Sequence, residues 1–120
     1  MNGQVDRSDR ALIALKIRPT LAAHSIELTA WIDTAFTGEL VVPRSFIDEL
    51  GLPQSSAVMA GLADGTEAVL DTFSCIVEWF DEERFIEVIE SDGQFALLGV
   101  GLLQGSKLEI DYRLRTVSIN

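Results

Sequence analysis

Side chains that carry much of enzyme chemistry are scarce in this sequence. Its 120 residues include one cysteine, Cys75, so no disulfide can form within the chain and a reducing compartment is its natural environment. The single histidine, His24, lies near no serine or cysteine in a nucleophile motif, and we expect it on a surface loop. No cluster of histidine and cysteine has the spacing of a metal site, so the sequence predicts no bound metal.

Positive charge is also scarce. Nine lysines and arginines stand against 19 acidic residues, and the net charge of −10 disfavours binding to nucleic acids or anionic membranes. No apolar run approaches the roughly 20 residues that a membrane span needs. The first ten residues carry no apolar region of a signal peptide, so we expect a cytoplasmic protein. The pair Gly99 and Gly101 lacks the third glycine of a dinucleotide-binding motif, and no cofactor is expected.

What the chain does contain predicts one compact domain. Apolar residues make up 48% of the sequence, enough for a sizeable core at this length. Residues 1–10 are polar and charged, which predicts a flexible N-terminal segment before a domain that spans residues 11–120. We interpret Cys75, which lies in an apolar and β-prone run, as a buried and inert thiol.

Alternating and β-prone patterns predict a mostly-β fold. The expected strands cover residues 11–18, 25–33, 40–42, 56–61, 67–80, 84–90, 95–100, 107–111 and 113–119. Pro43 and Gly51 bracket a predicted short helix, and residues 99–105 leave room for a turn or two of a second helix. Asp64-Gly65 is a strong signal for a two-residue hairpin turn.

One carboxylate stands out from the surface charges. Asp33 lies at the end of the alternating run of residues 25–33, where a turn begins. A carboxylate in such a position is partly desolvated and held by backbone donors, so it is a candidate for acid–base chemistry. The alternative is that Asp33 only caps the junction between strand and turn. By contrast, Asp81-Glu82-Glu83 is best interpreted as a solvated turn rather than a calcium site.

Two segments follow one another in a characteristic order. The first, at residues 31–43, reads WIDTAFTGELVVP and is followed by Leu-Gly-Leu at residues 50–52. The second, at residues 96–103, reads ALLGVGLL and precedes the closing strands at residues 108–112 and 116–119. Together they resemble the apolar–apolar–Asp-Thr-Gly and apolar–apolar–Gly motifs of the small, single-lobed aspartic proteases of clan AA, the retropepsin-like group. The order and spacing of the segments carry the resemblance.

The resemblance implies a closed, barrel-like acid-protease domain that is mostly β, with one or two short helices. It also implies an aspartic endopeptidase, in which two carboxylates share one proton and activate one water. This chain supplies only Asp33, because Gly99 stands at the corresponding place in the second segment. A homodimer with one Asp33 from each subunit would therefore complete the site and act on a peptide or protein substrate.

The resemblance assigns further residues to the site. Thr34 would hold the active-site loop through hydrogen bonds between subunits, or it caps its own turn; both interpretations stay open. Ala63, Asp64, Gly65 and Thr66 lie where the family has its substrate-binding flap.

Ala35 replaces the glycine that is usual in the family's motif. A Cβ at this position is costly if φ is positive, and it could shift the two Asp33 carboxylates out of hydrogen-bonding geometry. A second interpretation therefore stands beside the peptidase. The chain could be a catalytically silent dimerisation or peptide-binding module that retains the fold.

Overall fold

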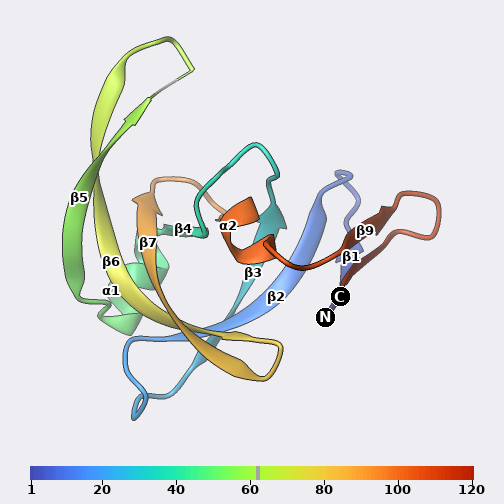
Figure 1. Ribbon diagram of the computed structural model, residues 1–120, viewed down its shortest axis with the longest axis horizontal. Helices are drawn as coiled ribbons and strands as arrows, with labels where there is room; N and C mark the ends of the chain where they lie inside the picture. Colours follow the sequence, from blue (N-terminus) through green and yellow to red (C-terminus); the bar gives the residue numbers. More distant parts are fainter. Residues whose placement is uncertain (62) are drawn as a thin grey trace.

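The computed structural model describes residues 1–61 and 63–120, with the side chain of residue 60 left out of the description. Within this part of the chain, ten strands and two short helices follow one another (Figure 1). The strands are β1 (Asn2–Val5), β2 (Ala11–Arg18), β3 (Ile26–Ile32), β4 (Leu40–Pro43), β5 (Gln54–Gly61), β6 (Glu67–Trp79), β7 (Glu82–Ser91), β8 (Ala96–Leu98), β9 (Leu108–Asp111) and β10 (Thr116–Ile119). The helices are α1 (Arg44–Leu50) and α2 (Val100–Leu103). The predicted mostly-β class is confirmed.

Six of these strands close into a barrel. They are bonded in the order β6-β7-β4-β8-β3-β2, and two residue pairs between β2 and β6 complete the ring. Because side chains alternate across each strand, one set points into the barrel and is buried. The largest fully buried side chains include Leu15, Ile17, Leu28, Leu40, Val77, Val88 and Leu98. The closed barrel expected from the sequence is thus present.

The order of the strands β3, β8 and β4 places a loop across the end of the middle strand, β8. β8 lies between β3 and β4, parallel to β3 and antiparallel to β4. The chain that leaves β3 must therefore cross the carboxyl end of β8 before it enters β4. Residues 33–39 make this crossing, so the predicted active-site turn lies directly beside the segment that follows β8.

The N-terminal segment contributes the strand β1 to the sheet. β1 pairs with both β2 and β10 in antiparallel registers. The amino group of Met1 donates a hydrogen bond to the carbonyl of Ile119 at 2.7 Å. The two ends of the chain lie side by side in Figure 1. A strand of four residues with no hydrophobic pattern is ordered here because its backbone groups pair with strands on both sides.

The β5–β6 hairpin extends far beyond the barrel and bends over it (Figure 1). Its last bonded pair is Gly61 with Glu67, so the connection is longer than the predicted two-residue turn at Asp64-Gly65. The prediction of a hairpin is confirmed, and the predicted turn type is wrong. A five-residue connection built on an Asx turn replaces the tight primed turn.

The predicted short helices are both present. Pro43 precedes α1 with φ −58°, and Gly51 ends it in the left-handed conformation with φ +65°. The strand expected at residues 95–100 ends earlier, at Leu98, because Val100 already starts α2. Among the described residues, no helix is long and apolar enough to cross a membrane.

Candidate functional site

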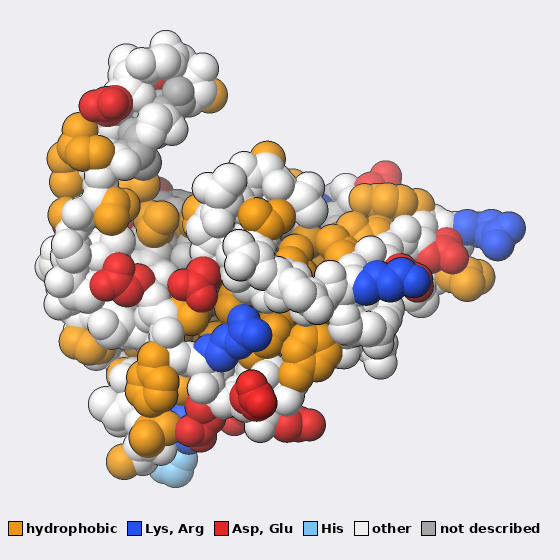
Figure 2. Space-filling view, in the orientation of Figure 1, with side chains coloured by type: hydrophobic (Ala, Val, Ile, Leu, Met, Phe, Trp, Pro, Cys, Tyr) orange, Lys and Arg blue, Asp and Glu red, His pale blue; other side chains and the backbone are white. Residues whose placement is uncertain are grey.

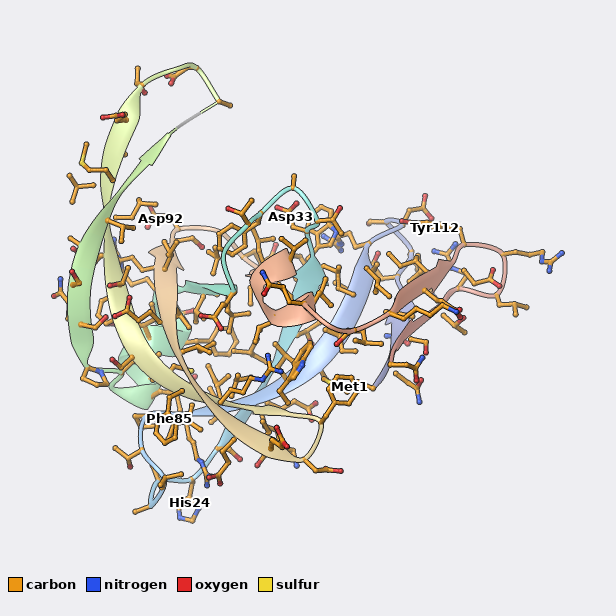
Figure 3. All side chains as sticks on the ribbon, in the orientation of Figure 1. Met1, His24, Asp33, Phe85, Asp92 and Tyr112 are labelled. Atoms are coloured by element: carbon orange, nitrogen blue, oxygen red, sulfur yellow. The ribbon has the colours of Figure 1, made fainter. Side chains whose placement is uncertain are left out.

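Asp33 begins the loop that crosses β8, and backbone bonds hold it in place. Its N–H donates to the carbonyl of Leu98 at 2.9 Å, which continues the parallel pairing of β3 with β8 by one residue. Its Oδ1 accepts the N–H of Ala35 at 3.0 Å, and its carbonyl accepts the N–H of Phe36 at 3.1 Å. The half-buried carboxylate is therefore fixed in an Asx turn with room for further partners. Figure 3 shows Asp33 on the side of the barrel over which the β5–β6 hairpin bends. This hairpin is called the flap hairpin below.

The rest of the loop is bonded to the segment after β8. Gly99 N–H donates to Glu39 O at 3.0 Å, and Val100 N–H donates to Phe36 O at 2.9 Å. A third bond, from Gly101 N–H to Gly38 O, measures 2.9 Å. Two short backbone segments thus lie against each other with almost no side chain between them. This contact explains the glycine that stands in the second segment where the first has its aspartate.

The two residues after Asp33 are exposed. Among the described residues, non-glycine positions with positive φ are Asp9, Phe80, Asp81 and Arg115, so Ala35 is not strained by its Cβ. Within the subunit, alanine at this position therefore costs nothing in backbone conformation. The side-chain hydrogen bond inside this turn comes from Asp33. Thr34 is the first of these two residues, and both interpretations of its role remain predictions.

A pocket of about 350 Å³ lies directly beside the carboxylate. It is lined by Trp31, Ile32, Asp33 and Leu97 and is mainly apolar. Trp31 lies on the outward face of β3 and is 40% exposed, which is high for so large an apolar side chain. Trp31 is not among the site residues predicted from the sequence, although a tryptophan on the otherwise polar face of a strand is a signal that could have identified it.

A second pocket, of about 520 Å³, lies between the flap hairpin and the barrel. Phe36 of the Asp33 loop and Val69 of β6 contribute to its apolar wall. Arg44 lies at its rim and pairs with Glu90 at 2.9 Å and with Asp92 at 3.8 Å. Figure 2 shows the hollow between the flap and the body of the molecule. Both pockets are open beside the same loop, as an extended ligand would require.

The flap residues predicted from the sequence form a local turn. Oδ1 of Asp64 accepts the N–H and the hydroxyl of Thr66 at 3.0 and 2.6 Å, and these bonds hold the pKa of Asp64 below its usual value. Gly65 has φ +86°, a conformation that favours glycine. Ala63 is exposed. Asp64 therefore stabilises its own turn.

The remaining chemical candidates lie away from the loop. Cys75 is 3% exposed, and burial raises the pKa of its thiol to about 12, so it is an inert core residue. His24 is exposed on the loop between β2 and β3, at the opposite end of the molecule from Asp33 in Figure 3. Within residues 1–61 and 63–120, no group of three histidine, cysteine or acidic side chains is arranged to hold a metal ion.

Comparison with solved structures gives extensive similarities at low sequence identity. A retropepsin-like aspartic protease from Rickettsia conorii matches with a TM-score of 0.71 and 17% identity, over 100% of this chain and 89% of the other. EIAV protease, in complex with the inhibitor HBY-793, matches with a TM-score of 0.65 and 16% sequence identity, over 88% of this chain and 97% of the other. The protease of simian foamy virus matches with a TM-score of 0.55 and 20% sequence identity, over 77% of this chain and 90% of the other. No protein-family model and no curated protein matches the sequence. The chain therefore has the retropepsin-like fold that its motifs resemble.

Proposed function

We propose that this chain, whose fold is retropepsin-like, is an aspartic endopeptidase that works as a homodimer with one Asp33 from each subunit. The observation that carries the proposal is the placement of Asp33. Its carboxylate is anchored by one backbone N–H, lies beside an apolar pocket and faces the side covered by the flap hairpin. A carboxylate that served only as a cap would need neither the pockets nor the hairpin.

The proposed chemistry divides two roles between the paired carboxylates. Two acids that share one proton hold one member ionised and the other protonated. The ionised member takes a proton from water as the water oxygen attacks the peptide carbonyl carbon. The protonated member donates its proton toward the carbonyl oxygen, which carries the developing charge. When the tetrahedral intermediate collapses, the C–N bond breaks and the departing nitrogen takes the proton that the first carboxylate had received from water. The second carboxylate takes back a proton from a hydroxyl of the intermediate, which leaves a carboxylic acid and an amine as products.

The surroundings of Asp33 suit an extended peptide as substrate. The flap hairpin presents backbone groups around Gly61 and Gly65 above the loop, and backbone bonding of this kind favours a strand-like ligand. The pocket at Trp31 and Leu97 would take an apolar side chain next to the cleaved bond. The larger pocket at Phe36 and Val69 would take a side chain further along the peptide.

The experiment that tests this function combines assembly with activity. We expect the purified protein to sediment as a dimer and to cleave members of a broad peptide library between acidic and neutral pH, because the proposed site needs two copies of Asp33. Analytical ultracentrifugation and mass spectrometry of the digests provide the two measurements. A strict monomer would exclude the shared pair of Asp33 residues. A dimer that binds library peptides without cleaving any would favour the silent dimerisation or peptide-binding module.

The Ala35→Gly variant tests the residue that departs from the family's motif. Because Ala35 is exposed and its φ is not positive, we expect the substitution to change kcat/KM by less than about tenfold. The measurement is kcat/KM of wild type and of Ala35→Gly on one peptide, at equal dimer concentration. An increase of about 100-fold would mean instead that the two methyl groups hold the Asp33 carboxylates apart by roughly 1 Å.

A further inference from the structure

Trp31 lines the pocket beside Asp33 and packs against Phe95, and the two rings are called the aromatic wall below. Trp31 and Phe95 meet edge to face, with ring centroids 6.2 Å apart and planes at 80°. Trp31 is 40% exposed and Phe95 is half-buried, so the aromatic pair is not enclosed by the close-packed core. Its orientation must come from neighbouring side chains.

Arg10 supplies that contact. Its guanidinium carbon lies 4.3 Å from the centroid of the Phe95 ring and 5.7 Å from that of Trp31. Both distances lie within the range in which a cation is attracted to the face of an aromatic ring. One planar group therefore contacts both members of the wall, which arrive from strand β3 and from the segment before β8.

Asp6 holds Arg10 in this position. Nε of Arg10 donates to Oδ2 of Asp6 at 2.7 Å, while Oδ1 accepts the backbone N–H groups of Arg10 and Ser8 at 3.0 and 2.9 Å. The side chains of Arg10 and Asp6 are only 28% and 20% exposed. A second arginine, Arg115, donates to the carbonyl of Asp6 from the far side. The turn between β1 and β2 is thus built around one carboxylate, with Arg10 projecting from it onto the rings.

We propose that Arg10, held by Asp6, is a positioning residue that fixes the Trp31–Phe95 wall, and with it the ring of Trp31 that lines the pocket containing Asp33. The wall then presents a preformed aromatic surface to an apolar side chain of the peptide next to the cleaved bond. This consequence for substrate binding rests on the proposed function, whereas the orientation of the wall does not. The N-terminal turn becomes part of the substrate site without touching the reacting atoms.

A spectroscopic test uses the two tryptophans of the chain. Trp79 is 1% exposed and Trp31 is 40% exposed, so acrylamide quenches mainly Trp31. We expect Arg10→Met and Asp6→Asn to shift the emission of Trp31 and to increase its quenching about twofold, because the cation no longer covers the wall. Arg10→Lys, which keeps the charge without the planar group, should fall between Arg10→Met and wild type. Arg7→Met removes the same charge from an exposed position in the same turn and should change nothing.

Kinetics separates this proposal from the proposed function. With a peptide that carries an apolar residue beside the cleaved bond, Arg10→Met should raise KM about three- to tenfold and change kcat by less than about twofold. If quenching of Trp31 changes and neither wild type nor any variant cleaves a peptide, the positioning role of Arg10 is supported and the peptidase assignment fails. If wild type cleaves peptides but Arg10→Met alters neither quenching nor KM, or alters only the free energy of unfolding, the positioning role is refuted.

Discussion

Asp33→Asn is expected to lower the rate of peptide cleavage by about 10³-fold or more while the fold stays intact. The carboxamide has the shape of the carboxylate and can still accept the N–H of Ala35, so the turn keeps its hydrogen bond. It cannot take a proton from water, and loss of a positioned acid or base typically costs about 10²- to 10⁴-fold in rate. The measurement is cleavage of one library-derived peptide, with circular dichroism and sedimentation to establish that fold and assembly are unchanged.

Mixing the variant with wild type tests whether the site is shared between subunits. If the subunits exchange freely, an equal mixture contains about one half hybrid dimers and about one quarter of each parental dimer, so it should retain about one quarter of the activity of an all-wild-type sample at the same total concentration. Subunits that act alone would retain about one half. Arg7→Met, exposed and distant in chain position from the loop, is the matched control and should leave the mixture fully active. Cleavage by Asp33→Asn at the wild-type rate would contradict the proposed chemistry altogether.

The part of the fold governed by local patterns could be predicted from the sequence. Alternation identified the long strands of the barrel, and Pro43 and Gly51 marked the ends of α1 because their backbone preferences act locally. The position of Asp33 at the end of β3 followed from the same pattern. These features depend on neighbours within a few residues, which the sequence displays directly.

Features that depend on distant partners could not be predicted in the same way. The strand β1 is polar and only four residues long, and its main partner, β10, lies at the other end of the chain. Likewise, the cluster of Arg10, Trp31 and Phe95 joins three separate segments and exists only through the registers of β2 with β3 and of β3 with β8. No local pattern specifies such registers between strands far apart in sequence.

Gly99 lies between these two cases. Its presence in the second motif was evident from the sequence, but its physical reason is the contact between two backbones. A Cβ built on Gly99 would lie 2.7 Å from the carbonyl oxygen of Phe36 and closer still to that of Gly38. Its φ of −96° is open to any residue, so close packing alone demands glycine here. The hydrogen bond from Gly99 to Glu39 would have to lengthen if the segments were pushed apart.

Gly99→Ala should therefore destabilise the protein by about 3 kcal/mol, at the upper end of the cost of overpacking, because backbone atoms rather than a flexible side chain must move. Activity should fall with stability, since the displaced segment also carries Leu98, whose carbonyl holds the N–H of Asp33. Urea unfolding at one fixed protein concentration measures the first effect, and peptide cleavage under native conditions measures the second. Gly93→Ala is the matched control: its φ is not positive and the nearest atom to its Cβ is the Ser91 hydroxyl at 3.4 Å, so we expect a change within about 1 kcal/mol. Equal stability of the two variants would mean that the loop does not depend on the close approach of these backbones.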